Sequence, residues 1–256
     1  KAWSLNKEEN YALGVSNVLI EKRPDSAALF LEEATRALPQ SIFLQIMLAR
    51  SYDAAGKTDN ALAVCETILR SDSTQVNTLY LKSELLEKKN DVAGMIDALE
   101  KASRLVPGNN EIASKLMYQY AESRNPKALA LADEMIRKDS LKLNAGPLYV
   151  KGLYYSNIND AAKAISLFNA TIQQDHNYLN AYIEKGKIQF NQRKIQEALR
   201  TFQLANVVKP SFPDAWYWIG RCQEALGEKE EAKSNYEKAY GLDKTFTEAK
   251  EAADRL

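Results

Sequence analysis

The chain has 256 residues, with 34 lysines and arginines balanced by 34 aspartates and glutamates, and 45% of its residues are hydrophobic. A chain without an excess of positive charge is a poor candidate for nucleic-acid binding, because phosphate contacts need clustered lysine and arginine. Its longest apolar stretches fall well short of the roughly 18–20 residues that a membrane-spanning helix needs.

The first residue, Lys1, is not methionine. We therefore expect that residues once preceded it, as a secretion signal, a lipid-anchored N-terminus or a further domain. Two localisations fit the sequence: the cytoplasm or, if an N-terminal signal was removed, the bacterial periplasm or envelope.

One position recurs along the whole chain at a nearly constant spacing. It is filled by Ala27, Ala61, Met95, Ala128, Ala164, Ala198 and Ala232, with gaps of 34, 34, 33, 36, 34 and 34 residues. A period in this range indicates stacked repeats, each too small to bury its own apolar face. After a lead-in at 1–7 we predict seven repeats within 8–246: 8–41, 42–75, 76–109, 110–144, 145–178, 179–212 and 213–246.

Each repeat is expected to contain two antiparallel helices joined by a tight turn. The predicted turns contain residues that tolerate the left-handed backbone needed to end a helix, namely Gly56, Asn90, Asn159 and Gly227. In the first helix of the last three repeats, a column of glycines lets the second helix approach closely: Gly152, Gly186 and Gly220.

The fourth repeat departs from this pattern. Met117 stands where glycine is usual, Asn125 and Pro126 lie in a turn that is one residue short, and two extra residues fall at 141–144. We therefore predict a local irregularity of the superhelix at 122–146, which is either ordinary variation among repeats or a hinge or partner-specific kink.

The two ends of the repeat array need cover, because terminal repeats require a polar outer face. Trp3 is expected to cover the exposed edge of the first repeat. Residues 247–256 are short and charged, and we predict that they form a C-terminal capping helix with its alanines turned inward: Ala249, Ala252 and Ala253.

The seventh repeat carries most of the pattern W-x2-L-G-x2-Y, then A-x3-F, then P. The corresponding residues are Trp216, Ile219, Gly220, Gln223, Ala232, Tyr236 and Ala239. The chain therefore resembles the tetratricopeptide repeat (TPR) family over nearly its whole length. The resemblance implies an all-α, right-handed α-solenoid of seven TPR-like helix-turn-helix units plus a capping helix. It also implies a scaffold or adaptor that binds other proteins.

Few residues suggest catalysis or metal binding. Cys65 and Cys222 lie five repeats apart in core columns, so they are too distant for a disulfide and are expected to be buried thiols. The single histidine, His176, lies between two repeats and is expected to be a plain turn residue. No glycine-rich nucleotide-binding loop occurs. We therefore expect no enzymatic activity, no cofactor and no metal.

In the TPR family the first helix of every repeat lines an inner groove, and the resemblance places two residues of each first helix, four apart, in it. The candidate partner-binding residues are Tyr80, Glu84, Tyr118, Tyr149, Leu153, Ile183, Lys187, Tyr217 and Arg221. Tyrosine supplies contact area and a hydroxyl at low entropic cost. The hypothesis is a groove that holds an extended or helical segment of another protein, centred on Tyr118, Tyr149, Leu153, Ile183 and Tyr217. The alternative is that these tyrosines rest on neighbouring helices and cover the core.

TPR proteins that clamp the C-terminal carboxylate of chaperones carry lysine and asparagine on successive first helices. Here Arg50, Lys187 and Arg221 are isolated cations in repeats that are not all adjacent, which argues against such a clamp. Three alternatives to an independent scaffold stay open: the recognition arm of a larger multidomain enzyme, a bacterial envelope assembly factor, and self-association. The sequence does not identify the partner protein or peptide.

Overall fold

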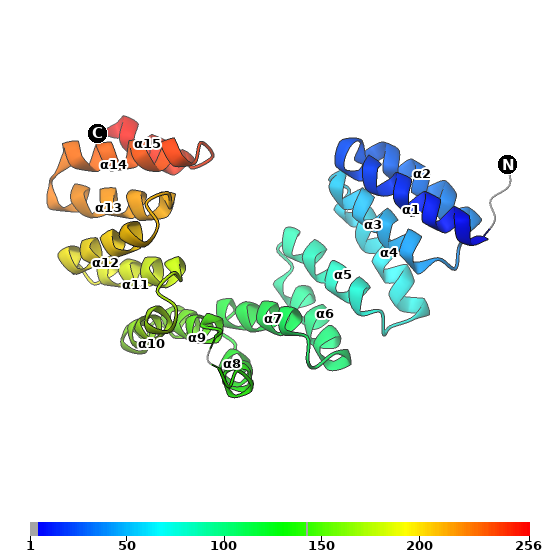
Figure 1. Cartoon of the computed structure of the whole chain (residues 1–256), viewed down its shortest axis with the longest axis horizontal. Coiled ribbons are helices and arrows are strands. Elements are labelled where there is room, and N and C mark those ends of the chain that lie inside the picture. The colour runs from blue at the N-terminus through cyan, green and yellow to red at the C-terminus, as the bar shows by residue number, and fades with distance from the viewer. Residues whose placement is uncertain (1–4, 142) are drawn as a thin grey trace. The chain divides into compact units, whose positions relative to one another are not determined.

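The computed structural model describes residues 5–141 and 143–256, with side chains from Glu9 onward. The prediction for Trp3 lies outside the described residues. Within these ranges the chain forms fifteen α-helices and no strand (Figure 1), which confirms the all-α prediction. The helices belong to two compact bodies, one ending at Leu116 and the other beginning at Met117.

The N-terminal body is built from helix pairs, and the first helix of each pair is called here a leading helix. Its helices are α1 (Leu5–Lys22), α2 (Pro24–Ala37), α3 (Ile42–Ala54), α4 (Thr58–Ser71), α5 (Val76–Lys88) and α6 (Val92–Leu105), followed by the start of α7 (Asn110–Glu122). Each helix packs on the next along the chain from α1 to α6, and the leading helices α1 and α3 also contact each other.

The C-terminal body is likewise built from helix pairs. It contains the end of α7 and then α8 (Lys127–Lys138), α9 (Gly146–Asn157), α10 (Ala161–Gln174), α11 (Leu179–Asn191), α12 (Ile195–Val208), α13 (Pro213–Leu226), α14 (Lys229–Leu242) and α15 (Thr247–Arg255). The leading helix α11 contacts both α9 and α13, so these three leading helices lie side by side.

Close helix approach follows from pairing a small residue with a large one. A Cβ atom added at Gly152 would lie 2.6 Å from Cε1 of Phe168, and one added at Gly220 would lie 2.8 Å from Cδ1 of Tyr236. Gly186 faces the ring of Phe202 in the same way. The predicted role of the glycine column is confirmed, since any side chain there would collide with a buried ring.

The tight turns have the predicted left-handed backbone. Gly56, Asn90, Asn159 and Gly227 have φ values of 74°, 56°, 64° and 86°. Two further turns place an arginine in this conformation, Arg124 at 57° and Arg193 at 63°, which residue type alone does not suggest. Helix pairing therefore imposes the turn geometry even where the local residue opposes it.

The segment 122–146 differs from the other repeats in the length of its helix and of its connection. Helix α8 has 12 residues, whereas α6 and α10 on either side of it have 14. It ends at Lys138 while α9 begins only at Gly146, a wider gap than the one between Leu105 of α6 and Asn110 of α7. The fourth repeat thus has a shortened second helix followed by a long connection.

The C-terminal helix α15 covers the last pair as predicted. Ala249, Ala252 and Ala253 are buried, and two of them join the side chains of Ala232 and Tyr236 in one apolar cluster. Because α15 packs on α14 in the manner of a leading helix, its outer face continues the surface formed by α11 and α13.

Candidate partner-binding face

Three of the residues proposed to line the groove are buried. Tyr149, Leu153 and Ile183 are 8%, 6% and 4% exposed, so they offer little area to a partner. The Tyr149 ring lies 5.7 Å from that of Phe168 and 4.9 Å from that of Tyr178, and burial raises the pKa of the Tyr149 hydroxyl. For these three positions the burial favours the alternative stated above, in which the side chains are covered by neighbouring elements and form part of the core.

Tyr118 differs from these three residues, because 41% of its surface is exposed. In the N-terminal body, Tyr80 and Glu84 are half-buried on α5. The hydroxyl of Tyr80 donates a hydrogen bond to Oε1 of Glu111 at 2.8 Å. Burial and this carboxylate raise the pKa of Tyr80 to about 12, so the hydroxyl stays protonated and acts as a donor.

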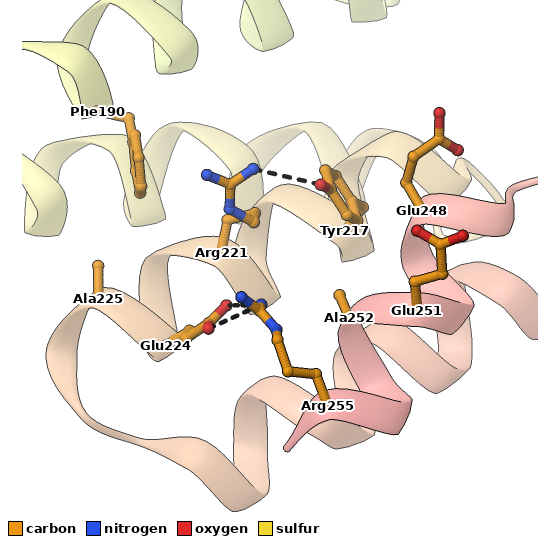
Figure 2. Close-up of a pocket in the computed structure, with 9 residues that line it drawn as sticks. All are labelled: Phe190, Tyr217, Arg221, Glu224, Ala225, Glu248, Glu251, Ala252 and Arg255. Atoms are coloured by element: carbon orange, nitrogen blue, oxygen red, sulfur yellow. Dashed lines mark hydrogen bonds and ion pairs between the residues drawn. The ribbon is translucent and has the colours of Figure 1, made fainter.

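Arg221 on α13 is held by aromatic rings. Its guanidinium carbon lies 5.6 Å from the ring centre of Phe190, 5.9 Å from that of Tyr217 and 5.4 Å from that of Trp218. Nη1 also donates to the Tyr217 hydroxyl at 3.2 Å (Figure 2). Cation–π contacts of this kind orient the guanidinium while leaving its remaining N–H groups available.

The acid nearest in sequence, Glu224, is already paired. Arg255 of α15 approaches Oε1 of Glu224 at 2.8 Å, and the Tyr236 hydroxyl donates to Oε2 at 2.7 Å. Figure 2 shows this pair crossing from α15 to α13 beside Arg221. In the described part of the chain no carboxylate forms an ion pair with Arg221.

Lys187 on α11 lies close to the same cluster. Its ammonium lies 5.8 Å from the ring centre of Trp218, the ring that also contacts Arg221, and 2.8 Å from Oε1 of Glu184. Lys187 and Arg221 are therefore not isolated from each other. Trp218 itself stacks on Phe202 at 5.4 Å, which fixes the ring between the two cations and the core.

These side chains border a hollow of about 650 Å³ on the leading-helix face of the C-terminal body. It is lined by parts of α11, α13 and α15: Phe190, Tyr217, Arg221, Glu224, Ala225, Glu248, Glu251, Ala252 and Arg255. Two of the predicted residues, Tyr217 and Arg221, lie in it. The family pattern does not predict the other lining residues. Those on α11 and α13 lie one turn beyond the two groove positions of each helix, and the rest lie on α15, which was predicted only to be a capping helix.

The remaining chemical expectations concern metals, thiols and membranes. Cys65 and Cys222 are free and buried, as predicted. Among the described residues no group of histidine, cysteine, aspartate and glutamate side chains is arranged to hold a metal ion. No described helix combines the length and apolar character needed to cross a bilayer.

Comparison with known proteins finds a family match for one repeat and distant relatives for the whole chain. Residues 213–246 match the tetratricopeptide repeat model. The chain is 24% identical over 232 residues to DnaJ homolog subfamily C member 7 from Homo sapiens, covering 88% of this chain and 42% of that protein. It spans about half the length of the curated relatives it matches.

Two crystal structures have a similar fold. A tetratricopeptide repeat protein from Parabacteroides merdae has a TM-score of 0.74 at 16% identity, over 96% of this chain and 97% of its own. A chain of the APC/C hetero-tetramer Cut9-Hcn1 has a TM-score of 0.57 at 13% identity, over 97% of this chain and 46% of its own. Residues 213–246 are thus a member of the tetratricopeptide repeat family, and the chain is an all-α solenoid of tetratricopeptide-repeat type.

Proposed function

We propose that the chain is a protein-binding scaffold whose leading-helix face holds a segment of another protein, with Arg221 anchoring an acidic group of that segment. The observation that carries this proposal is the arginine itself, which is half-buried under three rings beside an open hollow and has no carboxylate partner in the described chain. An arginine keeps its charge in such a setting, and a partly desolvated charge gains most from a new ionic partner.

The arrangement of charges along the face favours an elongated ligand. Lys187, Arg221 and Arg255 occupy equivalent positions of α11, α13 and α15, so their sequence spacing is 34 residues. Lys187 is paired with Glu184 and Arg255 with Glu224. A segment crossing the three helices meets one cation per repeat, and the middle one is unpaired within the described residues.

Protein assembly by a similar fold supports a scaffold. The structural neighbour of the Cut9-Hcn1 hetero-tetramer belongs to a multi-chain complex and shares this fold over nearly the whole chain. We also infer that the chain binds its partner without catalysing a reaction. The charged and aromatic side chains around the hollow contact one another as ion pairs and ring contacts.

A random-peptide selection tests the proposal and requires no identified partner. A displayed library of random 12-residue peptides is panned on the purified chain, and the affinities of selected peptides are measured by fluorescence anisotropy. Selected peptides are expected to contain aspartate or glutamate. Since a hydrogen bond to a charged group contributes about 1.5–3 kcal/mol, Arg221→Ala is expected to weaken their binding roughly 10- to 100-fold.

The matched control is Arg200→Ala, which removes an exposed arginine from the second helix α12. Circular dichroism verifies that both variants stay folded. Equal binding by wild type and Arg221→Ala refutes the anchor, as does an equal loss in the Arg200→Ala control. Failure of the library to yield any specific peptide counts against the scaffold function itself.

A further inference from the structure

The N-terminal body has a hollow of its own on its leading-helix face. It measures about 360 Å³ and is bordered by α1, α3, α5 and the start of α7. Its apolar lining consists of Leu13, Phe43, Ile46, Met47, Val76 and Ile112. Polar residues complete the lining: Arg50, Asn77, Tyr80, Asn109 and Glu111. The hollow therefore combines aliphatic, thioether and aromatic surface with polar groups, and two of its eleven lining residues are charged, against five of nine around Arg221.

Phe43 is the most unusual member of this lining. It is the second residue of α3 and is 65% exposed. The second residue is polar in α5, α7, α11, α13 and α15, where it is Asn77, Glu111, Asn180, Asp214 and Glu248, whereas in α9 it is Pro147. A single exposed apolar residue needs no explanation. Phe43, however, is an aromatic ring where five related helices carry a polar group, and it lies at the edge of a hollow with six apolar lining residues. Burying this ring under a partner would be favourable, because apolar surface would leave water.

The charges at the rim indicate what covers it. Arg50 lies two turns beyond Phe43 on α3, is exposed, and forms no ion pair within the described chain. The carboxylate at the opposite wall, Glu111, already accepts a hydrogen bond from the Tyr80 hydroxyl at 2.8 Å. The charged group of this hollow that lacks a partner among the described residues is therefore a cation, and Ile46 and Met47 of the same helix lie beside it in the lining.

We propose that this hollow seats one large apolar side chain of a partner segment, packed against Phe43, Ile46 and Met47, while an acidic side chain of the same segment pairs with Arg50. The proposal extends the scaffold function proposed above, but it uses a different body of the chain and an apolar anchor. The chain then has one pocket in each body, and it holds two different segments at once.

The test uses the full chain carrying Arg221→Ala, so that the C-terminal anchor is absent. Random 12-residue displayed peptides are panned on this protein, and selected peptides are expected to combine a large apolar residue with aspartate or glutamate. Phe43→Asn introduces the residue type found at the same position of α5 and α11, and it is expected to weaken binding at least tenfold. Arg50→Glu is expected to reject the acidic peptides and to select basic ones.

The chain offers a matched control in Leu29, an apolar residue of α2 that is also 65% exposed and lies outside the hollow. Leu29→Asn is expected to bind the selected peptides within twofold of the parent protein. Peptides that bind Phe43→Asn equally well, or that lose binding equally in Leu29→Asn, overturn the proposal. A concentration-dependent dimer in sedimentation that Phe43→Asn abolishes also overturns it, because the occupant is then a second copy of the chain.

The two proposals fail in distinguishable ways. If peptides selected on Arg221→Ala do not depend on Phe43, while those selected on wild type depend on Arg221, the Phe43 site is wrong and the anchor of the C-terminal body stands. If peptides selected on Arg221→Ala depend on Phe43, while those selected on wild type depend on neither Arg221 nor any acidic residue, the anchor is wrong and the Phe43 site stands. If wild type yields no peptide that depends on either residue, both proposals fall.

Discussion

Replacing Gly152 by alanine is the most direct test of how the helix pairs are held together. Gly152 lies on α9 opposite Phe168 of α10, and an added Cβ would lie 2.6, 2.8 and 3.1 Å from three atoms of the ring. Carbon atoms in packed interiors are separated by about 3.5–4.0 Å. Phe168 is fully buried, so its ring has no solvent-filled space into which it can move.

The expected loss follows from two opposing effects. Overpacking a close-packed core by one methyl group destabilises by about 1–3 kcal/mol. Alanine in place of glycine within a helix recovers about 0.5–1 kcal/mol of conformational entropy. Because the shortest contact is far below van der Waals distance, the upper part of the first range applies, and Gly152→Ala should lose about 2 kcal/mol net.

A second substitution supplies the decisive comparison. In the third repeat the corresponding residues are Ser83 and Leu99, a slightly larger residue opposite a smaller one. Phe168→Leu should therefore make room for a methyl group at position 152. Alone it leaves a cavity that costs roughly 1–2 kcal/mol. The double variant should be more stable than the sum of the two losses by about 1 kcal/mol or more.

The measurement is urea unfolding followed by far-UV circular dichroism for all four proteins. Because repeat arrays unfold partly as neighbouring units, the slope of each transition must be compared before free energies are subtracted. Gly241→Ala on α14 serves as control, since its Cβ would meet nothing within 4 Å and should stabilise the helix by about 0.5–1 kcal/mol. Equal behaviour of Gly152→Ala and Gly241→Ala, or fully additive losses in the double variant, refutes the reasoning.

Three further outcomes are expected. Arg193→Asn should raise the urea midpoint of unfolding, because asparagine tolerates φ near 63° and relieves part of the backbone-strain penalty of about 1 kcal/mol. The neighbouring substitution Gln192→Asn is the control and should not raise it. Burial raises the pKa of both Cys65 and Cys222 to about 12, so at pH 8 the thiols stay protonated and should react with a disulfide reagent only after unfolding. Removing residues 247–256 uncovers Tyr236 and should lower the unfolding midpoint while leaving most helical signal; complete loss of helix contradicts the additive-repeat picture.

The repeat architecture was predictable because it depends on residue size at fixed spacing. Alanine and glycine columns reveal where two helices touch, since only small residues allow the approach seen at Gly152 and Gly220. Turns containing glycine or asparagine were predictable for a similarly local reason. Arg124 and Arg193 were not, because their left-handed backbone is imposed by packing of the flanking helices rather than by their own preference.

The accessible surface was harder to predict than the fold. Tyr149 and Ile183 occupy positions that face outward from a single helix pair, yet both are buried in the assembled body. Tyr149 is covered by Phe168 of its own pair and by Tyr178 in the connection after α10. Ile183 shares a cluster with Ile219 of the next leading helix. A rule applied to one repeat cannot include cover that the following repeat provides.

Some residues differ from those at the equivalent positions of the other repeats, and these differences help to separate functional residues from structural ones in this chain. The fourth repeat places Met117 where Gly152, Gly186 and Gly220 stand, and at the position of Phe168, Phe202 and Tyr236 it places the small Ala132. That exchange keeps the summed volume of the column pair, so it needs only a packing explanation. Phe43 has no such compensation: it replaces a polar residue and remains exposed. Arg221 is likewise uncompensated within the described chain, because its equivalents Lys187 and Arg255 each have a carboxylate. A partner can supply what the chain itself does not: apolar cover for Phe43 and a carboxylate for Arg221. Both proposed anchors are therefore residues whose environment the described chain leaves incomplete.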